Sequence, residues 1–343
     1  MRIFVTGCAG FIGFHISKKL IEDGNKVVGI DNINKYYDQK LKKSRLKILM
    51  ELSKKNKKNF LFIKGDITNK NLIKKIFLKT KFNKVIHLAA QAGVRYSLQN
   101  PRLYLNTNIK GFFNVLDESR KNKIKQFIYA STSSVYGGNT KIPFKEIHPA
   151  DHPLQLYAAT KKSNELMAHA YSSLYGLPTI GLRFFTVYGP WGRPDMALFD
   201  FTRRILSGKK INLFNHGRHS RDFTYIDDIV QGIFKIVKSK KLKRKKQLKN
   251  QQDISESFAP YQILNIGKGK NVSLMKFIKA IEKATLKKAK IKKLPFQPGD
   301  IKDTFADTSK IKKYYKYLPQ TDFELGVHNF VNWYKNFYKI KNI

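Results

Sequence analysis

The chain has 343 residues, enough to bury a large core in one or two domains, and 42% of them are hydrophobic. It carries a formal net charge of +43, but lysine supplies most of the 67 basic side chains and is scattered along the sequence. This pattern disfavours specific nucleic-acid recognition, which relies on arginine at base edges and on stacked aromatic rings.

A location in the cytoplasm is expected. The first residues have the pattern of a strand, and no apolar run approaches the roughly 20 residues that a membrane-spanning helix needs. The single cysteine, Cys8, excludes an internal disulfide framework and fits a reducing compartment. Neither a membrane span nor a metal site is expected.

The first predicted element is a short apolar strand over residues 2–6, which runs into three glycines spaced three apart. Glycine is needed where such a strand turns sharply, where the backbone approaches a pyrophosphate, and where the following helix packs on the strand. The phosphates then meet the N-terminus of that helix. The pattern predicts a dinucleotide-binding loop formed by Gly7, Gly10, Phe11, Ile12 and Gly13.

The second predicted strand, residues 26–31, ends in Asp31. An acid at this place accepts hydrogen bonds from the adenosine ribose hydroxyls and repels a 2′-phosphate. The sequence therefore favours NAD over NADP as the cofactor.

Further strands are predicted at 59–64, 84–88, 125–130 and 178–183, with helices between them and a lysine-rich helix within 37–58. This alternation predicts an α/β fold with a doubly wound parallel sheet of the Rossmann type. Beyond residue 183 the rhythm breaks, and a smaller C-terminal α/β substrate domain is expected. The expected division is 1–185 and 186–343, with residues near 222–240 returning to the first domain and a surface loop at 238–253.

Tyr157 and Lys161 are one helical turn apart and share a helix face. A nearby ammonium favours the phenolate, which makes the tyrosine a usable general base. Thr132 lies in a run of hydroxyl residues at the carboxyl end of a predicted strand, where open α/β sheets bind their ligands. Thr132, Tyr157 and Lys161 are therefore the candidate catalytic residues.

Together with the glycine loop, this spacing resembles the short-chain dehydrogenase/reductase superfamily, in its extended branch of nucleotide-sugar epimerases and dehydratases. The longest matching stretches lie at residues 5–15, 87–97, 157–167, 182–196 and 221–228. They are most similar to the UDP-glucuronate 4-epimerases. The resemblance implies a UDP-sugar substrate, bound NAD, and epimerisation at C4 through a 4-keto intermediate.

The resemblance also implies roles for further residues. Cofactor contacts are implied for Asp66, Ile67, Leu88, Ala89, Ala90 and Asn108. Substrate contacts are implied for Arg95, Thr132, Ser133, Ser134, Thr186, Arg193 and Arg221, with Arg221 on the pyrophosphate and Arg193 near the sugar carboxylate. The alternative for Asn108 is a structural role as a polar group at the start of a helix.

Ser133 and Ser134 distinguish this chain from two groups of enzymes that it resembles. Related 4,6-dehydratases place Asp-Glu directly after the catalytic threonine, and related decarboxylases carry a glutamate at the position of Ser134. Two serines here favour simple epimerisation of UDP-glucuronate. A 4-epimerase of another UDP-hexose or pentose remains open, as does a non-catalytic dinucleotide- or nucleic-acid-binding protein. The resemblance further implies a homodimer that pairs through helices at 108–121 and 157–175.

Overall fold

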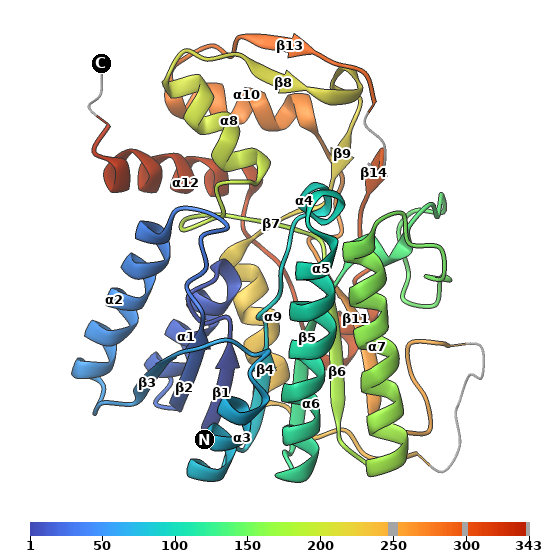
Figure 1. The fold of residues 1–343 in the computed structure, drawn as a ribbon. Coiled ribbons are helices and arrows are strands. Elements are labelled where there is room, and N and C mark those ends of the chain that lie inside the picture. The colour runs from blue at the N-terminus through green and yellow to red at the C-terminus, as the bar shows by residue number, and fades with distance from the viewer. Residues whose placement is uncertain (246–252, 297–300, 341–343) are drawn as a thin grey trace.

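The computed structural model describes residues 1–245, 253–296 and 301–340. It contains a large α/β layer structure with a smaller group of helices and short strands above it (Figure 1). Part of the surface loop expected at 238–253, residues 246–252, lies outside the described residues.

A seven-stranded parallel sheet forms the centre of the larger part, in the order β11-β6-β5-β4-β1-β2-β3. All its neighbouring strands pair in parallel. The strands are β1 (Arg2–Thr6), β2 (Lys26–Asp31), β3 (Phe60–Lys64), β4 (Lys84–His87), β5 (Gln126–Thr132), β6 (Thr179–Phe184) and β11 (Tyr261–Ile266). The Rossmann-type sheet predicted from the sequence is confirmed.

Two details of the sheet differ from expectation. β5 continues past residue 130 to Thr132, which pairs with Phe184 of β6. The seventh strand, β11, comes from the region assigned to the second domain, so the expected division at residue 185 leaves out one strand of the sheet. All six residues of β11 are buried, which is the burial that a covered parallel strand requires.

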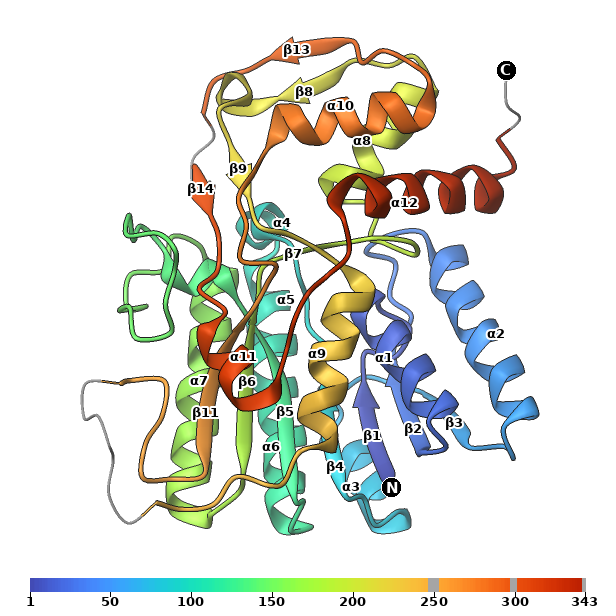
Figure 2. The ribbon, with the colours of Figure 1, turned by 180° about the vertical axis from the view of Figure 1, so that it is seen from behind.

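Helices cover both faces of the sheet (Figures 1 and 2). One face carries α1 (Phe11–Glu22), α2 (Gln39–Lys55), α9 (Ile226–Lys238) and α11 (Ser309–Tyr315). The other carries α3 (Lys70–Lys79), α6 (Phe112–Lys121) and α7 (Leu156–Tyr175), with α4 (Val94–Gln99), α5 (Pro101–Tyr104) and the π-helix η1 (Leu105–Gly111) leading into α6. Each face has its own apolar core. The segment expected to return near 222–240 coincides with α9, beside α1 (Figure 2).

The smaller group of elements lies above the carboxyl ends of the sheet strands (Figure 1). It comprises α8 (Ala197–Leu206), β8 (Ile211–Leu213), η3 (Phe214–Gly217), β9 (Ser220–Arg221), β12 (Val272–Ser273), α10 (Leu274–Thr285), β13 (Ile291–Lys293), β14 (Asp303–Thr304) and α12 (Phe323–Tyr338). The short parallel pair of β7 (Thr186–Tyr188) and β10 (Phe223–Tyr225) joins it to the sheet. Among the described residues, no helix combines the length and apolar character needed to cross a bilayer.

Candidate active site

A cavity of about 1010 Å³ opens at the carboxyl ends of the sheet strands, beneath the smaller group of elements. Its wall includes every residue that the sequence analysis assigned to catalysis, cofactor or substrate, with the exception of Asn108. Segments as far apart in the chain as Gly7 and Arg221 thus meet around one space.

Asn108 is buried below the cavity wall instead of lining it. Its amide oxygen accepts a hydrogen bond from Gln91 N at 2.8 Å, and its amide nitrogen donates to Gln91 O at 3.0 Å and to Thr160 Oγ1 at 3.1 Å. A side chain that satisfies both main-chain groups of Gln91 fixes the loop after β4. The cofactor contact that the resemblance implies for Asn108 stays a prediction.

The glycine loop forms a cradle that larger residues would fill. A Cβ on Gly7 would lie 2.8 Å from Ala89 N, and a Cβ on Gly13 would lie 2.0 Å from Gly7 O. Gly7 also has a φ of +73°, and Gly10 N donates to Gly7 O at 2.9 Å as α1 begins. A tight turn at the N-terminus of a helix, next to the end of β4, fits the pyrophosphate of a dinucleotide.

Two carboxylates follow the neighbouring strands. Asp31 accepts hydrogen bonds from Ala9 N at 3.1 Å and Ile33 N at 2.9 Å, and burial raises the pKa of its carboxyl above the ordinary value. Burial also opposes ionisation of Asp66, but hydrogen bonds from Thr68 N and the Asn32 amide outweigh it, so its pKa is lowered. Both acids lie at the edge where an adenosine would meet the sheet.

The three candidate catalytic residues converge from β5 and α7. Thr132 caps the short helix η2 (Ser133–Tyr136): its hydroxyl accepts from Ser134 N at 3.2 Å and donates to Ser134 Oγ at 3.3 Å. Burial raises the pKa of Tyr157, while the charge of Arg193 and a hydrogen bond with Thr132 act in the opposite direction. Burial lowers the pKa of Lys161 to about 8. Burial therefore disfavours the charged form of both Tyr157 and Lys161, and both side chains line the same cavity.

Beneath Lys161 lies a buried ion pair that sequence reasoning missed. Glu165, one turn further along α7, accepts from Arg183 Nη2 at 2.8 Å, from Arg183 Nε at 2.9 Å and from Ser131 Oγ at 2.6 Å. The Glu165 charge opposes the effect of burial on the pKa of Lys161. A glutamate four residues after the lysine, on the same helix face, was the available signal.

The three arginines expected near the substrate have different surroundings. The Arg95 guanidinium lies 4.8 Å from the centre of the Phe214 ring, and Arg221 Nη1 donates to Ser220 O at 2.9 Å and Lys302 O at 2.7 Å. Arg193 is paired with Asp195. All three line the cavity, and each guanidinium already contacts a neighbouring residue of the protein.

The wall also contains residues that the sequence analysis did not select, notably Tyr36, Lys42 and Asp195. Lys42 Nζ donates to Asn34 O at 2.9 Å, and burial lowers the pKa of this lysine to about 8. Asp195 stands inside a stretch quoted for the family resemblance, and Tyr36 follows Asp31 by five residues. Their proximity depends on tertiary contacts between segments that are far apart in the chain, which no local pattern specifies.

A parallel sheet with a glycine cradle after β1, and with a Tyr-x-x-x-Lys pair facing the end of β5, defines a short-chain dehydrogenase/reductase fold. Comparison with known proteins narrows this class. Residues 4–330 match the family model described as GDP-mannose 4,6 dehydratase. The chain belongs to the NAD-dependent epimerase/dehydratase family.

The relatives cover essentially the whole chain. It is 50% identical to Protein CapI of Staphylococcus aureus over 339 residues, 99% of this chain and 100% of that protein. It is 44% identical to the probable UDP-glucuronate 4-epimerase of Rhizobium meliloti over 341 residues, 99% of this chain and 98% of that protein. The resemblance to UDP-glucuronate 4-epimerases inferred from the motifs is thereby confirmed.

A solved structure gives the same result in three dimensions. The UDP-glucuronic acid 4-epimerase of Bacillus cereus, in complex with UDP-glucuronic acid and NAD, superimposes with a TM-score of 0.86 at 32% identity. The match covers 98% of this chain and 100% of that one.

Proposed function

We propose that this protein is an NAD-dependent 4-epimerase that interconverts UDP-glucuronate and UDP-galacturonate. The observation that carries the proposal is the composition of one wall: Thr132 ends β5, Ser133 and Ser134 follow it without an acid, and all three share the cavity with Tyr157 and Lys161. The family relatives support it, because two of those compared above are named UDP-glucuronate or UDP-glucuronic acid 4-epimerases.

The proposed cofactor contacts follow the first two strands. Gly7, Gly10 and Gly13 leave room for a pyrophosphate, and Asp31 stands at the end of β2, where it suits the hydroxyls of an NAD ribose. NAD, when bound, supplies reversible oxidation at the sugar C4. The elements above the sheet are proposed to bind the UDP-sugar.

Proton transfer is assigned to Tyr157. Its phenolate accepts the proton of the sugar 4-hydroxyl as C4 is oxidised and returns it when C4 is reduced from the opposite face. Burial raises the pKa of this tyrosine, whereas the charge of Arg193 and the hydrogen bond with Thr132 favour the phenolate, and Lys161 lines the same cavity. General acid–base catalysis by such a group contributes about 10²-fold to 10⁴-fold in rate.

The residues after β5 are proposed to restrain the sugar carboxylate. The 4-keto sugar is a β-keto acid, which loses CO₂ when its C5–C6 bond lies parallel to the π orbitals of the C4 carbonyl. The C5–C6 bond then breaks, CO₂ leaves, and the electron pair forms an enolate with the C4 carbonyl. Hydrogen bonds from Ser133, Ser134 and Arg193 hold the carboxylate out of that alignment. Ser134 Oγ already accepts from Thr132, which leaves its own proton available as a donor.

Incubation with UDP-glucuronate and chromatographic identification of the sugar product test the proposal. We expect UDP-galacturonate without net consumption of NAD. Conversion of UDP-galactose or a UDP-pentose, but not of UDP-glucuronate, would favour an epimerase of another UDP-sugar. Tight NAD binding without turnover of any UDP-sugar would favour a non-catalytic dinucleotide-binding protein.

A homodimer is also proposed. Helix α7 and the neighbouring α6 expose apolar side chains at Phe113, Leu166, Leu174 and Tyr175, with exposed fractions between 42% and 73%. Pairing of these two helices with their copies would cover that surface. Sedimentation equilibrium is expected to give twice the monomer mass, and a monomer at micromolar concentration would contradict the proposal. The cytoplasmic location stays a prediction from the sequence.

A further inference from the structure

Arg193 and Asp195 lie two residues apart in the loop between β7 and α8 and form a two-point ion pair. Arg193 Nε donates to Asp195 Oδ1 at 3.0 Å, and Nη2 donates to Oδ2 at 2.5 Å. Two parallel hydrogen bonds fix both the plane and the direction of a guanidinium. Because Asp195 accepts from Nε and Nη2, the N–H groups of Nη1 remain for a second partner.

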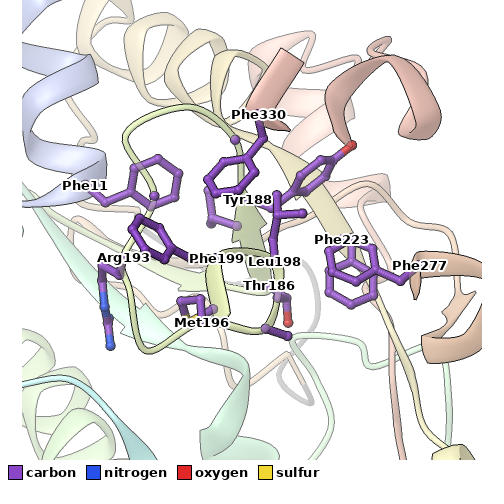
Figure 3. A pocket seen from close by; sticks show the side chains of 14 residues that line it. Phe11, Thr186, Tyr188, Arg193, Met196, Leu198, Phe199, Phe223, Phe277 and Phe330 are labelled. Carbon is purple, nitrogen blue, oxygen red and sulfur yellow. The ribbon is translucent and has the colours of Figure 1, made fainter. Parts of the chain in front are cut away.

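Arg193 lies on the cavity side of the loop. The side chain of Arg193 points away from the aromatic rings of Phe11, Phe199 and Phe330, against which the loop packs (Figure 3). Arg193, Asp195 and Tyr157 all line the large cavity. The positive charge of Arg193 also lowers the pKa of Tyr157, against the larger effect of burial. The guanidinium therefore lies on the same side as the proposed general base.

A second residue holds Asp195. The hydroxyl of Tyr36 donates to Asp195 Oδ2 at 3.1 Å. Tyr36 comes from the segment between β2 and α2, and its hydroxyl is confined because a Cβ on Gly93 would lie only 2.3 Å from it. Asp195 is thus fixed between an arginine of its own loop and a tyrosine of the larger part of the fold.

The start of the loop is fastened to the same part of the fold. Arg45, which is fully buried in α2, donates to Trp191 O at 2.5 Å and to Ala9 O at 2.8 Å in the glycine loop. His15 Nε2 of α1 lies 3.0 Å from Pro190 O. With both ends of the segment held, the Asp195 carboxylate forms a rigid platform for Arg193.

We propose that Asp195 and Tyr36 are positioning residues that aim Arg193 at the substrate carboxylate and thereby suppress loss of CO₂ from the 4-keto sugar. This inference rests on the proposed function. Asp195 keeps the partly buried cation paired before substrate arrives, so that no uncompensated charge faces the cavity. The substrate carboxylate then meets a guanidinium of fixed direction, and the hydrogen bonds that restrain it are formed without a further cost of ordering Arg193.

The test compares Asp195→Asn, Asp195→Glu and Tyr36→Phe with the wild type. For Asp195→Asn we expect a KM for UDP-glucuronate about tenfold higher, a smaller change in kcat, and a several-fold larger share of decarboxylated UDP-pentose product. Tyr36→Phe changes the same quantities in the same direction but less. Asp195→Glu restores part of the effect, because it keeps the acidic partner.

A matched control is Asp23→Asn, which removes an aspartate paired with Lys238 at 2.5 Å at the C-terminal end of α1. It is expected to leave KM and product composition unchanged. Calorimetry provides a readout that needs no turnover: Asp195→Asn should weaken the binding of UDP-glucuronate to the NAD-loaded protein and leave that of UDP-glucose within about twofold.

Two outcomes separate the proposals. If the wild type epimerises UDP-glucuronate but Asp195→Asn leaves KM, product composition and binding unchanged, the positioning role is overturned and the proposed function stands. If the wild type binds UDP-glucuronate without converting it, the proposed function fails, and selective weakening of that binding in Asp195→Asn would still support the positioning role.

Discussion

The cavity has two contrasting walls. The first, which follows β1, β2 and β4 and is called the main-chain wall below, is held by main-chain hydrogen bonds. The second, formed by residues 186–196 and called the loop wall, is held largely by side chains. In the first, Gly7 N donates to Ile30 O at 2.8 Å and Leu88 N donates to Thr6 O at 3.2 Å. In the second, the buried guanidinium of Arg45 and the hydroxyl of Tyr36 reach the loop from outside it.

This difference has a functional meaning. A wall made by main-chain geometry tolerates many side chains, so it can serve one cofactor across enzymes of different chemistry. A wall that is oriented by particular side chains can change its substrate through a few substitutions. Specificity is therefore expected to reside in the loop and in the residues after β5, where the two walls meet.

Replacement of Tyr157 by phenylalanine is the largest expected effect. The proton acceptor is lost, so kcat should fall about 10³-fold. Bound NAD should remain, because the ring still packs 6.1 Å from the Tyr104 ring and the glycine cradle is unchanged. Turnover of UDP-glucuronate and the NAD content of the purified protein measure the two parts.

Tyr171→Phe is the control for that substitution. It removes a hydroxyl from the same helix, where Tyr171 donates to Asp117 Oδ1 at 3.3 Å outside the cavity wall, and should leave kcat unchanged. Normal turnover in Tyr157→Phe would refute the assigned base. If Tyr157→Phe lost both NAD and turnover, NAD binding would depend on a side chain, and this would contradict the view that the main-chain wall holds the cofactor.

Local patterns were sufficient to predict several residues that line the cavity. The glycine loop, the strand that ends in Asp31, and the Tyr157–Lys161 pair are each encoded within a short stretch, because a turn or a helix face is set by neighbours in the chain. Strand ends in a parallel sheet meet at one edge, and this brought Thr132 into the prediction.

Long-range contacts explain what the sequence did not reveal. β11 pairs with β6 although about eighty residues separate them in the chain, and no local signal specifies that neighbour. Tyr36 meets Asp195 across the cavity for the same reason. The buried position of Asn108 under the loop after β4 depends in the same way on how the π-helix packs, and its cofactor contact stays a prediction.

Ser134→Glu tests the place where the two walls meet. A carboxylate there would repel the carboxylate of the sugar, and we expect epimerisation to slow about 10-fold to 100-fold, which corresponds to about 1.4–2.7 kcal/mol in the barrier. Decarboxylated product should also increase. Product analysis by chromatography measures both, and Ser134→Gln controls for size. An unchanged rate with no CO₂ released would contradict the assignment of this serine to carboxylate restraint.

The smallest expected effect on turnover concerns Glu146, which lies outside the cavity wall and is buried, with 4% of its surface exposed. Its Oε1 accepts from Asn265 N of β11 at 2.8 Å, and burial raises its pKa from about 4.5 to about 7. Below the pKa of the unfolded state the carboxyl is protonated in both states, and its full contribution to stability is present. That contribution is lost as the pH rises through 7, because the buried group must then ionise.

Glu146→Gln keeps an acceptor for Asn265 N but cannot ionise. Relative to the wild type, its free energy of unfolding should therefore increase by about 2–3 kcal/mol between pH 4.5 and pH 8.5. Urea unfolding of both proteins at the two pH values measures this, and the difference between them cancels the titration of all other groups. Turnover should be unchanged, because a side-chain contact remote from both walls contributes to stability alone. A pH-independent difference would show that the Glu146 carboxyl does not titrate in this range, and reduced turnover would extend the dependence on side chains beyond the loop wall.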